Sequence, residues 1–255
     1  MTNATVLPAT APERRILTQG TFQARDAGRY PAENGAQVRG GMLFRSDALS
    51  ALTADDLEEM KRREIGLVID LREKIESDAA PDLLPEGVEY QRIPIFEETL
   101  FQNDFDAFPT LLGQYQLVLD HHSPKLAEVI AVISDACAAQ TPVVVHCTAG
   151  KDRTGLVTAL VHLVLGVDEQ FVLTDYGASQ IILGIDFDGA VRDLYNRAGL
   201  PGAILGTEPH KAPPMYLKET LAEINRRHGS VEAFLIDQGL SEARITALRA
   251  GLLEH

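Results

Sequence analysis

Apolar residues gather in short runs along the first 165 residues of the chain, and these runs predict buried strands. The clearest is 143–145, three valines in succession after Thr141-Pro142. The run 65–71 is a second, the apolar piece 42–44 a third, and the alternating stretch 88–93 a fourth. Short apolar runs rich in branched side chains are typical of strands inside a sheet.

Helices are predicted between and after these strands. Thr53 can cap a helix that runs to about Arg63, and Pro124 suits the first turn of a helix that continues to about Ala139. Further helices are expected near 153–165, 214–228, 231–237 and 241–253. This order predicts an α/β fold with a largely parallel central sheet flanked by helices and a helical C-terminal third.

The domain plan follows from the same pattern. Residues 1–14 are predicted to form a flexible tail, and 15–255 a single domain. Glycines recur within 176–214, where they would permit a mobile helical lid. A static helical cap is an equal alternative.

Composition narrows the class of protein. The net charge of −14 argues against nucleic-acid binding, which needs an excess of Lys and Arg. No apolar run is long enough to span a membrane, and the N-terminus lacks the pattern of a signal peptide. Two cysteines cannot build a disulfide framework. A cytoplasmic protein is expected, export without a signal peptide stays open, and the sequence does not indicate an oligomeric state.

The segment 146–155, His-Cys-Thr-Ala-Gly-Lys-Asp-Arg-Thr-Gly, carries the chemistry. It follows the strongest strand and opens a helix at Arg153, where backbone amides and the helix dipole attract an anion. The spacing of Cys147 and Arg153 lets the loop curl, with the sulfur at its centre and the planar guanidinium on its rim. The predicted phosphate-binding residues are Thr148, Ala149, Gly150, Lys151, Asp152 and Arg153.

Cys147 is the predicted nucleophile, because positive surroundings favour a thiolate. Its attack on phosphorus would give a phosphocysteine, which water then cleaves. Loop amides and Arg153 would stabilise the charge of the transferring phosphoryl group, so no metal and no cofactor are expected. His146 can orient the loop and support the thiolate, and the hydroxyl of Thr154 can donate to Cys147 and ease its departure.

The pattern His-Cys-x-x-Gly-Lys-x-Arg-Thr-Gly resembles the signature of the protein tyrosine phosphatase superfamily. Its Gly-Lys-Asp-Arg-Thr part is similar to a bacterial branch of tyrosine and dual-specificity phosphatases, which includes a secreted mycobacterial type that also acts on phosphoinositides. The stretches 43–49, 68–72 and 215–230, together with Glu76, resemble that branch as well, so the resemblance spans roughly 15–253. Segment 21–30 departs from the usual Asn-Phe-Arg-Asp-Leu-Gly-Gly and keeps four of its residues in altered spacing.

The resemblance implies a phosphatase with phosphotyrosine proteins as the default substrate. A phosphoinositide phosphatase is one alternative, and a catalytically inactive phosphate-recognition module is another. Lys151 favours the first alternative, since it would add positive charge at the rim for further phosphates; its other interpretation is a solvated loop lysine. Arg45 and Asp47 are expected to brace the site from below.

The leaving group needs a proton, and the sequence leaves its donor open. Many relatives carry this acid in a Trp-Pro-Asp loop, but the chain has no Trp. Asp152 lies inside the phosphate-binding loop, and the resemblance points to it. Asp70 follows a buried strand, where residues that face ligands gather, yet it can equally be a structural carboxylate paired with an arginine. Asp104 and Asp106 are the next candidates.

Three other features have ordinary interpretations beside functional ones. The Phe-rich stretch 96–115 could line the approach of an aromatic or lipid group, or simply form core. His121-His122 lacks the partners of a metal site and is expected at a helix end in solvent. Cys137 is most simply a small core residue, with a redox partnership with Cys147 as the alternative.

Overall fold

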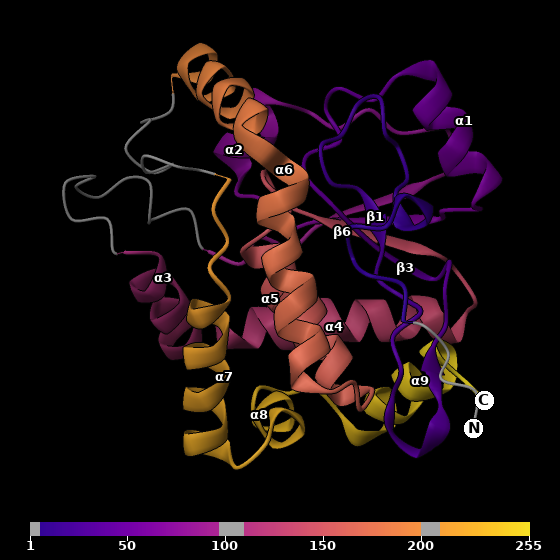
Figure 1. The fold of residues 1–255 in the computed structure, drawn as a ribbon, viewed down its shortest axis with the longest axis vertical. Helices are drawn as coiled ribbons and strands as arrows, with labels where there is room; N and C mark the ends of the chain where they lie inside the picture. Colours follow the sequence, from indigo (N-terminus) through magenta and orange to yellow (C-terminus); the bar gives the residue numbers. More distant parts are fainter. Residues whose placement is uncertain (1–5, 97–109, 200–209) are drawn as a thin grey trace.

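A five-stranded sheet organises the protein in the computed structural model, which describes residues 6–96, 110–199 and 210–255 (Figure 1). The strand order is β1-β3-β6-β4-β5, with β1 antiparallel to β3 and the other pairs parallel. The strands are β1 (Arg25–Asp26), β3 (Leu43–Ser46), β4 (Leu67–Asp70), β5 (Glu89–Arg92) and β6 (Val143–His146). A small second sheet pairs β2 (Gln37–Val38) with β7 (Leu253–Glu254). The predicted α/β fold with a largely parallel sheet is confirmed.

Helices surround the sheet, and every predicted helix is present. They are α1 (Ala54–Arg62), α2 (Lys74–Ala79), α3 (Leu111–Leu117), α4 (Ser123–Ala138), α5 (Arg153–Val164), α6 (Glu169–Ala198), α7 (Pro214–His228), α8 (Val231–Asp237) and α9 (Glu242–Leu252). Thr53 caps α1 through the amide of Asp56, as its position predicts. Helices α2 and α3 were not expected; both are short, and α3 leads through a π-helical turn into α4.

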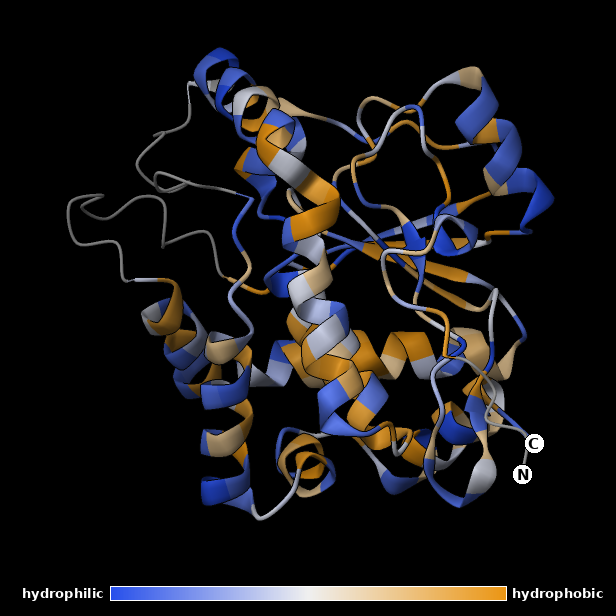
Figure 2. Ribbon diagram, in the orientation of Figure 1, coloured by the Kyte–Doolittle hydropathy of each residue, from blue (hydrophilic) through white to orange (hydrophobic). Residues whose placement is uncertain are grey.

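The strands alternate their side chains between two apolar clusters, because successive residues of a strand point to opposite faces. Val143 and Val145 join the large cluster that α4, α5 and the C-terminal helices complete. Val144 and its neighbour Phe44 join a smaller cluster with Met60 of α1. Figure 2 shows the same division, with apolar strands and inner helices and polar outer faces. The three valines are buried on both sides of the sheet.

The register of the parallel strands decides where the functional loop begins. Ser46, His146 and Asp70 are partners at the carboxyl ends of β3, β6 and β4. Cys147 therefore follows the end of the central strand β6, and the flanking strands β3 and β4 end at the same level. Ligands of open α/β sheets bind at this edge.

The N-terminal segment is more ordered than expected. Within the predicted tail, Ala9, Ala11 and Arg14 are buried. Arg14 donates to the carbonyl of Leu7 at 2.9 Å and lies 4.3 Å above the ring of Tyr30. These contacts hold residues 6–14 against the domain. Within the described residues, none of the helices has the length and apolar character needed to cross a membrane.

Candidate active site

The loop after β6 curls around the sulfur of Cys147, which is 2% exposed. The amide of Gly150 donates to its Sγ at 3.2 Å. Gly150 has φ of +64°, and a Cβ there would lie 2.2 Å from the carbonyl oxygen of Ser46. Only glycine combines that backbone conformation with so close an approach. The predicted curl, with the sulfur inside it, is present.

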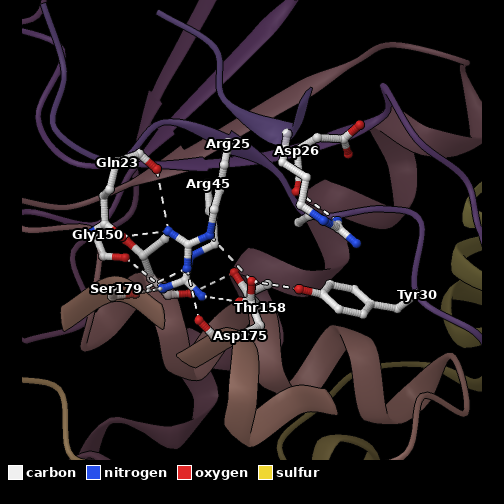
Figure 3. A network of polar contacts seen from close by, with 12 residues as sticks. Gln23, Arg25, Asp26, Tyr30, Arg45, Gly150, Thr158, Asp175 and Ser179 are labelled. Carbon is white, nitrogen blue, oxygen red and sulfur yellow. Dashed lines mark hydrogen bonds and ion pairs between the residues drawn. The ribbon is translucent and has the colours of Figure 1, made fainter. Parts of the chain in front are cut away.

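Two buried arginines form a polar cluster with Asp175 beside the loop, and Arg45 contacts the loop directly (Figure 3). Arg45 donates to the carbonyl of Gly150 at 2.7 Å and to Asp175 at 2.5 Å. Arg25 donates to the backbone carbonyl of Asp175 at 3.0 Å and to Ser179 at 3.1 Å. Burial opposes the charge of Asp175, but the two arginines outweigh it and hold the pKa of that carboxyl well below its usual range. Arg25, Arg45 and Asp175, which together brace the loop, therefore stay ionised.

Asp47 contributes to this brace indirectly. Its carboxylate accepts the amides of Phe22 and Gln23, each at 2.9 Å. The side-chain amide of Gln23 in turn donates to the carbonyl of Ala149. Segment 21–30, which departs from the pattern of the resembling branch, thus supplies a direct contact to the loop.

Arg153 lies at the start of α5 and is bound by a carboxylate from α2. It donates to Glu76 at 2.6 and 2.8 Å. Glu76 also accepts the hydroxyls of Thr148 at 2.5 Å and Tyr195 at 3.1 Å. Burial raises the pKa of Glu76, but the charge and hydrogen bonds of Arg153 prevail and lower it to about 2. The same pairing, against burial, keeps the pKa of Arg153 well above its usual range.

Glu73 stands beside this pair, and within the described residues its carboxyl group makes no hydrogen bond. Both of its carboxylate oxygens are buried, and the nearer lies 3.9 Å from Nη1 of Arg153. Burial and then the charge of Glu76 raise the pKa of Glu73 to about 9, despite Arg153. Glu73 is therefore a neutral acid at neutral pH, next to an ionised one.

Asp152 has contacts on both carboxylate oxygens. The hydroxyl oxygens of Tyr115 and Tyr176 lie 3.1 and 3.2 Å from its Oδ1. Its Oδ2 lies 3.4 Å from Nζ of Lys151, and its side chain is 24% exposed. Lys151 is mostly buried and donates to the carbonyl of Lys211 at 2.6 Å. The lysine is thus held against the segment before α7.

Asp70 is fully buried and bound by an arginine, the structural alternative that its sequence position left open. Arg72 donates to its two oxygens at 2.9 and 2.8 Å, and the hydroxyl of Tyr90 donates at 2.8 Å. Burial opposes its charge, but neighbouring His146 and then Arg72 lower the pKa of Asp70. Both carboxylate oxygens of Asp70 are therefore already hydrogen-bonded, to Arg72 just after β4 and to Tyr90 of β5.

Asp70, Asp82 and His146 bring three ligand atoms within 4.8 Å of one another, which is the sort of cluster that could hold a metal ion. Arg72, however, donates to Asp70 and Asp82 at 2.8 Å each. Its guanidinium already supplies the positive charge there. Nδ1 of His146 lies 3.3 Å from the carbonyl oxygen of Cys147, which places the imidazole where it can orient the loop.

The remaining candidates are placed as follows. The hydroxyl of Thr154 is buried and makes no hydrogen bond within the described residues, so its donation to Cys147 stays a prediction. Burial raises the pKa of the Cys137 thiol to about 12, which fits an inert core residue. His122 packs edge-on against Phe96. Asp104, Asp106 and most of the Phe-rich stretch lie outside the described residues.

The second half of α6 covers the loop. Gly184 breaks the helical dihedrals with φ 64° and ψ −178°, and beyond it Phe187, Val191 and Tyr195 form a separate apolar cluster. Ala149 of the loop packs against that cluster. Residues 176–198 of the segment that could form a lid or a static cap are helical, and 200–209 lie outside the described residues. Whether this segment moves stays a prediction.

Sequence reasoning missed several residues that shape the site: Gln23, Glu73, Tyr115, Asp175, Tyr176 and Tyr195. Each lies outside the loop. Gln23 falls in segment 21–30 and the three tyrosines fall in 96–115 or 176–214, but no sequence pattern gives any of the six a role. The sequence resemblance did include Glu76, but it did not indicate that this residue binds Arg153.

Comparison with known proteins identifies the family. The sequence pattern of the Tyrosine phosphatase family matches residues 16–254. The chain belongs to this family. A tyrosine-protein phosphatase of Nostoc commune is 30% identical over 236 residues, which cover 88% of this chain and 78% of the relative. The triple specificity protein phosphatase PtpB of Mycobacterium tuberculosis is 28% identical over 280 residues, covering 92% of this chain and 97% of PtpB.

Among solved structures, TpbA of P. aeruginosa is similar over 67% of this chain and 88% of its own, with 18% identity and a TM-score of 0.37. A likeness of that degree carries no information on the site. Membership of the family rests on the sequence matches, and it makes the protein a phosphatase that acts on a phosphorylated substrate.

Proposed function

We propose that this tyrosine phosphatase family member hydrolyses phosphotyrosine in proteins through a phosphocysteine intermediate at Cys147. The observation that carries the proposal is the loop itself: the Gly150 amide points at Sγ, and Arg153 is fixed at the other end of the same loop by Glu76. This arrangement provides a nucleophile surrounded by donors for phosphoryl oxygens.

In the first step the Cys147 thiolate attacks phosphorus. An S–P bond forms, the P–O bond to the tyrosine breaks, and the leaving oxygen takes a proton from Asp152. Arg153 and the loop amides hold the equatorial oxygens of the phosphoryl group. We assign the acid to Asp152 and not Asp70, because Asp152 lies in the loop and is partly exposed, whereas Asp70 is buried beneath Arg72.

In the second step water attacks the phosphocysteine. Asp152, now a carboxylate, accepts the proton of the water as the P–O bond forms. The S–P bond breaks, the thiolate returns, and inorganic phosphate leaves. One group thus acts as acid and then as base, which general acid–base catalysis in two half-reactions requires.

Hydrolysis of 4-nitrophenyl phosphate and of a phosphotyrosine peptide by wild type and Cys147→Ser tests this proposal. Wild type is expected to turn over both under reducing conditions and to yield a labelled phosphoenzyme on acid quench. Cys147→Ser should bind phosphate without turnover. A wild-type protein that binds phosphate but hydrolyses neither compound would be the inactive recognition module instead.

Activity on phosphoserine, phosphothreonine and phosphoinositides is a second proposal, which Lys151 supports. Its ammonium group lies at the loop, 3.4 Å from Asp152, and contacts Lys211 through a backbone carbonyl that further phosphates could replace. Lys151→Met should lower kcat/KM for a soluble phosphoinositide about tenfold more than for a phosphotyrosine peptide, the effect of one charge-assisted contact. Equal losses of kcat/KM on the two substrates would contradict a role of Lys151 in binding further phosphates.

We also propose that the second half of α6 is a cover that moves to admit a protein substrate. Phe187 packs edge-on against Phe22, with ring centroids 5.4 Å apart. Phe187→Ala should therefore raise kcat/KM for a phosphotyrosine peptide relative to 4-nitrophenyl phosphate. An unchanged ratio would indicate a static cap.

A further inference from the structure

Three oxygen atoms from three separate elements meet beside the phosphate-binding loop. The hydroxyls of Tyr115, in α3, and Tyr176, in α6, lie 3.1 and 3.2 Å from Oδ1 of Asp152. The two hydroxyls are 2.5 Å apart. Both tyrosines are buried, while the Asp152 side chain reaches the surface. Oδ1 is therefore held by two buried hydroxyls, whereas Oδ2 lies 3.4 Å from Nζ of Lys151.

Packing fixes this arrangement. The ring of Tyr176 lies against Gly155 of α5 so closely that a Cβ at Gly155 would be 2.8 Å from ring atom Cδ2. Tyr115 belongs to the main apolar cluster. Burial raises the pKa of Tyr115 and of Tyr176 well above the usual range, so both hydroxyls keep their protons at neutral pH. The pair can thus donate at neutral pH.

The number of hydroxyl protons limits how many hydrogen bonds Tyr115 and Tyr176 can donate to Asp152. Two hydroxyls carry two protons, and the shortest contact, between the hydroxyls, takes one of them. The other goes to Oδ1, from whichever tyrosine accepts. A hydroxyl that accepts one hydrogen bond is a stronger donor of the next, so both tyrosines contribute to the bond on Oδ1.

We propose that Tyr115 and Tyr176 are positioning residues that keep Oδ1 of Asp152 an acceptor, so that Oδ2 alone gives the proton to the leaving group and takes one from water. The inference rests on the proposed function, in which Asp152 is the acid and base. In the acid form Oδ1 is the carbonyl oxygen of the carboxyl group, and in the carboxylate it accepts the same bond. The pair serves both half-reactions without rearrangement.

The charged surroundings set the expected pH effect. Lys151 faces Oδ2 from the loop, and Arg45 acts on Tyr176 from β3. A donor to the carboxylate favours its ionised form. Loss of the hydroxyls should therefore move the basic limb of kcat/KM against pH to higher pH, and it should weaken the acid for leaving groups that need a full proton.

The test uses Tyr115→Phe, Tyr176→Phe and the double variant, with Tyr216→Phe of α7 as control. Phenyl phosphate has a poor leaving group and 4-nitrophenyl phosphate a good one. The double variant should lose about tenfold in kcat/KM on phenyl phosphate, as for one charge-assisted hydrogen bond, and less than about twofold on 4-nitrophenyl phosphate. The basic limb should move upward in the same variant and stay in place in the control.

Equal losses on the two substrates, or an unmoved basic limb, would overturn the inference. Inhibition by inorganic phosphate and the melting temperature show whether each variant keeps the loop and the fold, and the single variants serve if the double variant unfolds. Failure of the proposed function gives a different result. In that case wild type yields no phosphoenzyme, or Asp152→Asn slows both substrates alike, whatever the tyrosine variants do.

Discussion

The carboxylate of Glu76 binds both terminal nitrogens of Arg153, at 2.6 and 2.8 Å, across 77 positions of sequence. The pair joins α2 to the first residue of α5. Because Thr148 donates to the same carboxylate, Glu76 fixes both ends of the loop around Cys147.

Replacement of Glu76 by Gln should therefore affect both stability and turnover. It leaves a buried guanidinium without its counter-charge, at a cost of about 3–5 kcal/mol in the free energy of unfolding. Urea unfolding measures this cost, and kcat on 4-nitrophenyl phosphate should fall at least tenfold. Glu59→Gln, which removes a half-buried partner of Arg62 and Arg63 at the surface, is the control and should cost about 1 kcal/mol or less. Similar effects of the two changes would contradict the assigned role.

The raised pKa of Glu73 predicts that the free energy of unfolding falls as pH rises. Its pKa is about 9 in the folded protein and near 4.3 in an unfolded chain, so over that interval the folded state holds one proton more. Its contribution to the free energy of unfolding is fully present below about pH 4 and falls as pH rises toward 9.

Glu73→Gln removes that titration. Urea unfolding at several pH values should show a flatter profile between pH 5 and 9 for the variant than for wild type. Glu76 acts in the opposite sense, because its pKa of about 2 means that its contribution is lost as pH falls below about 4. Parallel profiles for wild type and Glu73→Gln would show that Glu73 is ionised in the folded state.

Asp152 and Asp70 should differ in how their loss depends on the leaving group. Asp152→Asn should slow phenyl phosphate at least about a hundredfold more than 4-nitrophenyl phosphate, because only the poor leaving group needs the proton. Asp70→Asn breaks the buried contacts with Arg72 and should lower stability by about 3 kcal/mol while it slows both substrates equally. The opposite pattern would assign the acid to Asp70.

Gly184 should be irreplaceable in α6. Its dihedrals, φ 64° and ψ −178°, belong to a region that only glycine enters readily, so Gly184→Ala is expected to cost about 1–3 kcal/mol and to expose 185–199 to limited proteolysis. Gly189, in the same helix, has open space around a Cβ, and Gly189→Ala should be neutral or slightly stabilising. Equal proteolysis of the two variants would argue against a hinge at Gly184.

Local signals predicted the elements well. Three valines predicted β6, Thr53 the start of α1, and Pro124 the first turn of α4. Two short helices escaped prediction: α2 has one large apolar residue among its six, and α3 contains Gly113, which disfavours a helix. The buried segment before β1 escaped as well, because Arg14 is held by backbone carbonyls that no sequence pattern reveals.

The sequence by itself determined the loop: a thiol, a glycine and a guanidinium at fixed spacing between a buried strand and a helix, in a segment that curls around its own sulfur. Tertiary structure decided which side chains from other helices and strands contact the loop. Glu76 for Arg153, Arg45 for Gly150 and the tyrosine pair for Asp152 depend on which helices pack beside β6. Such partners are set by the burial of whole faces, and a carboxylate or hydroxyl acquires its role only from the charge that packing places beside it.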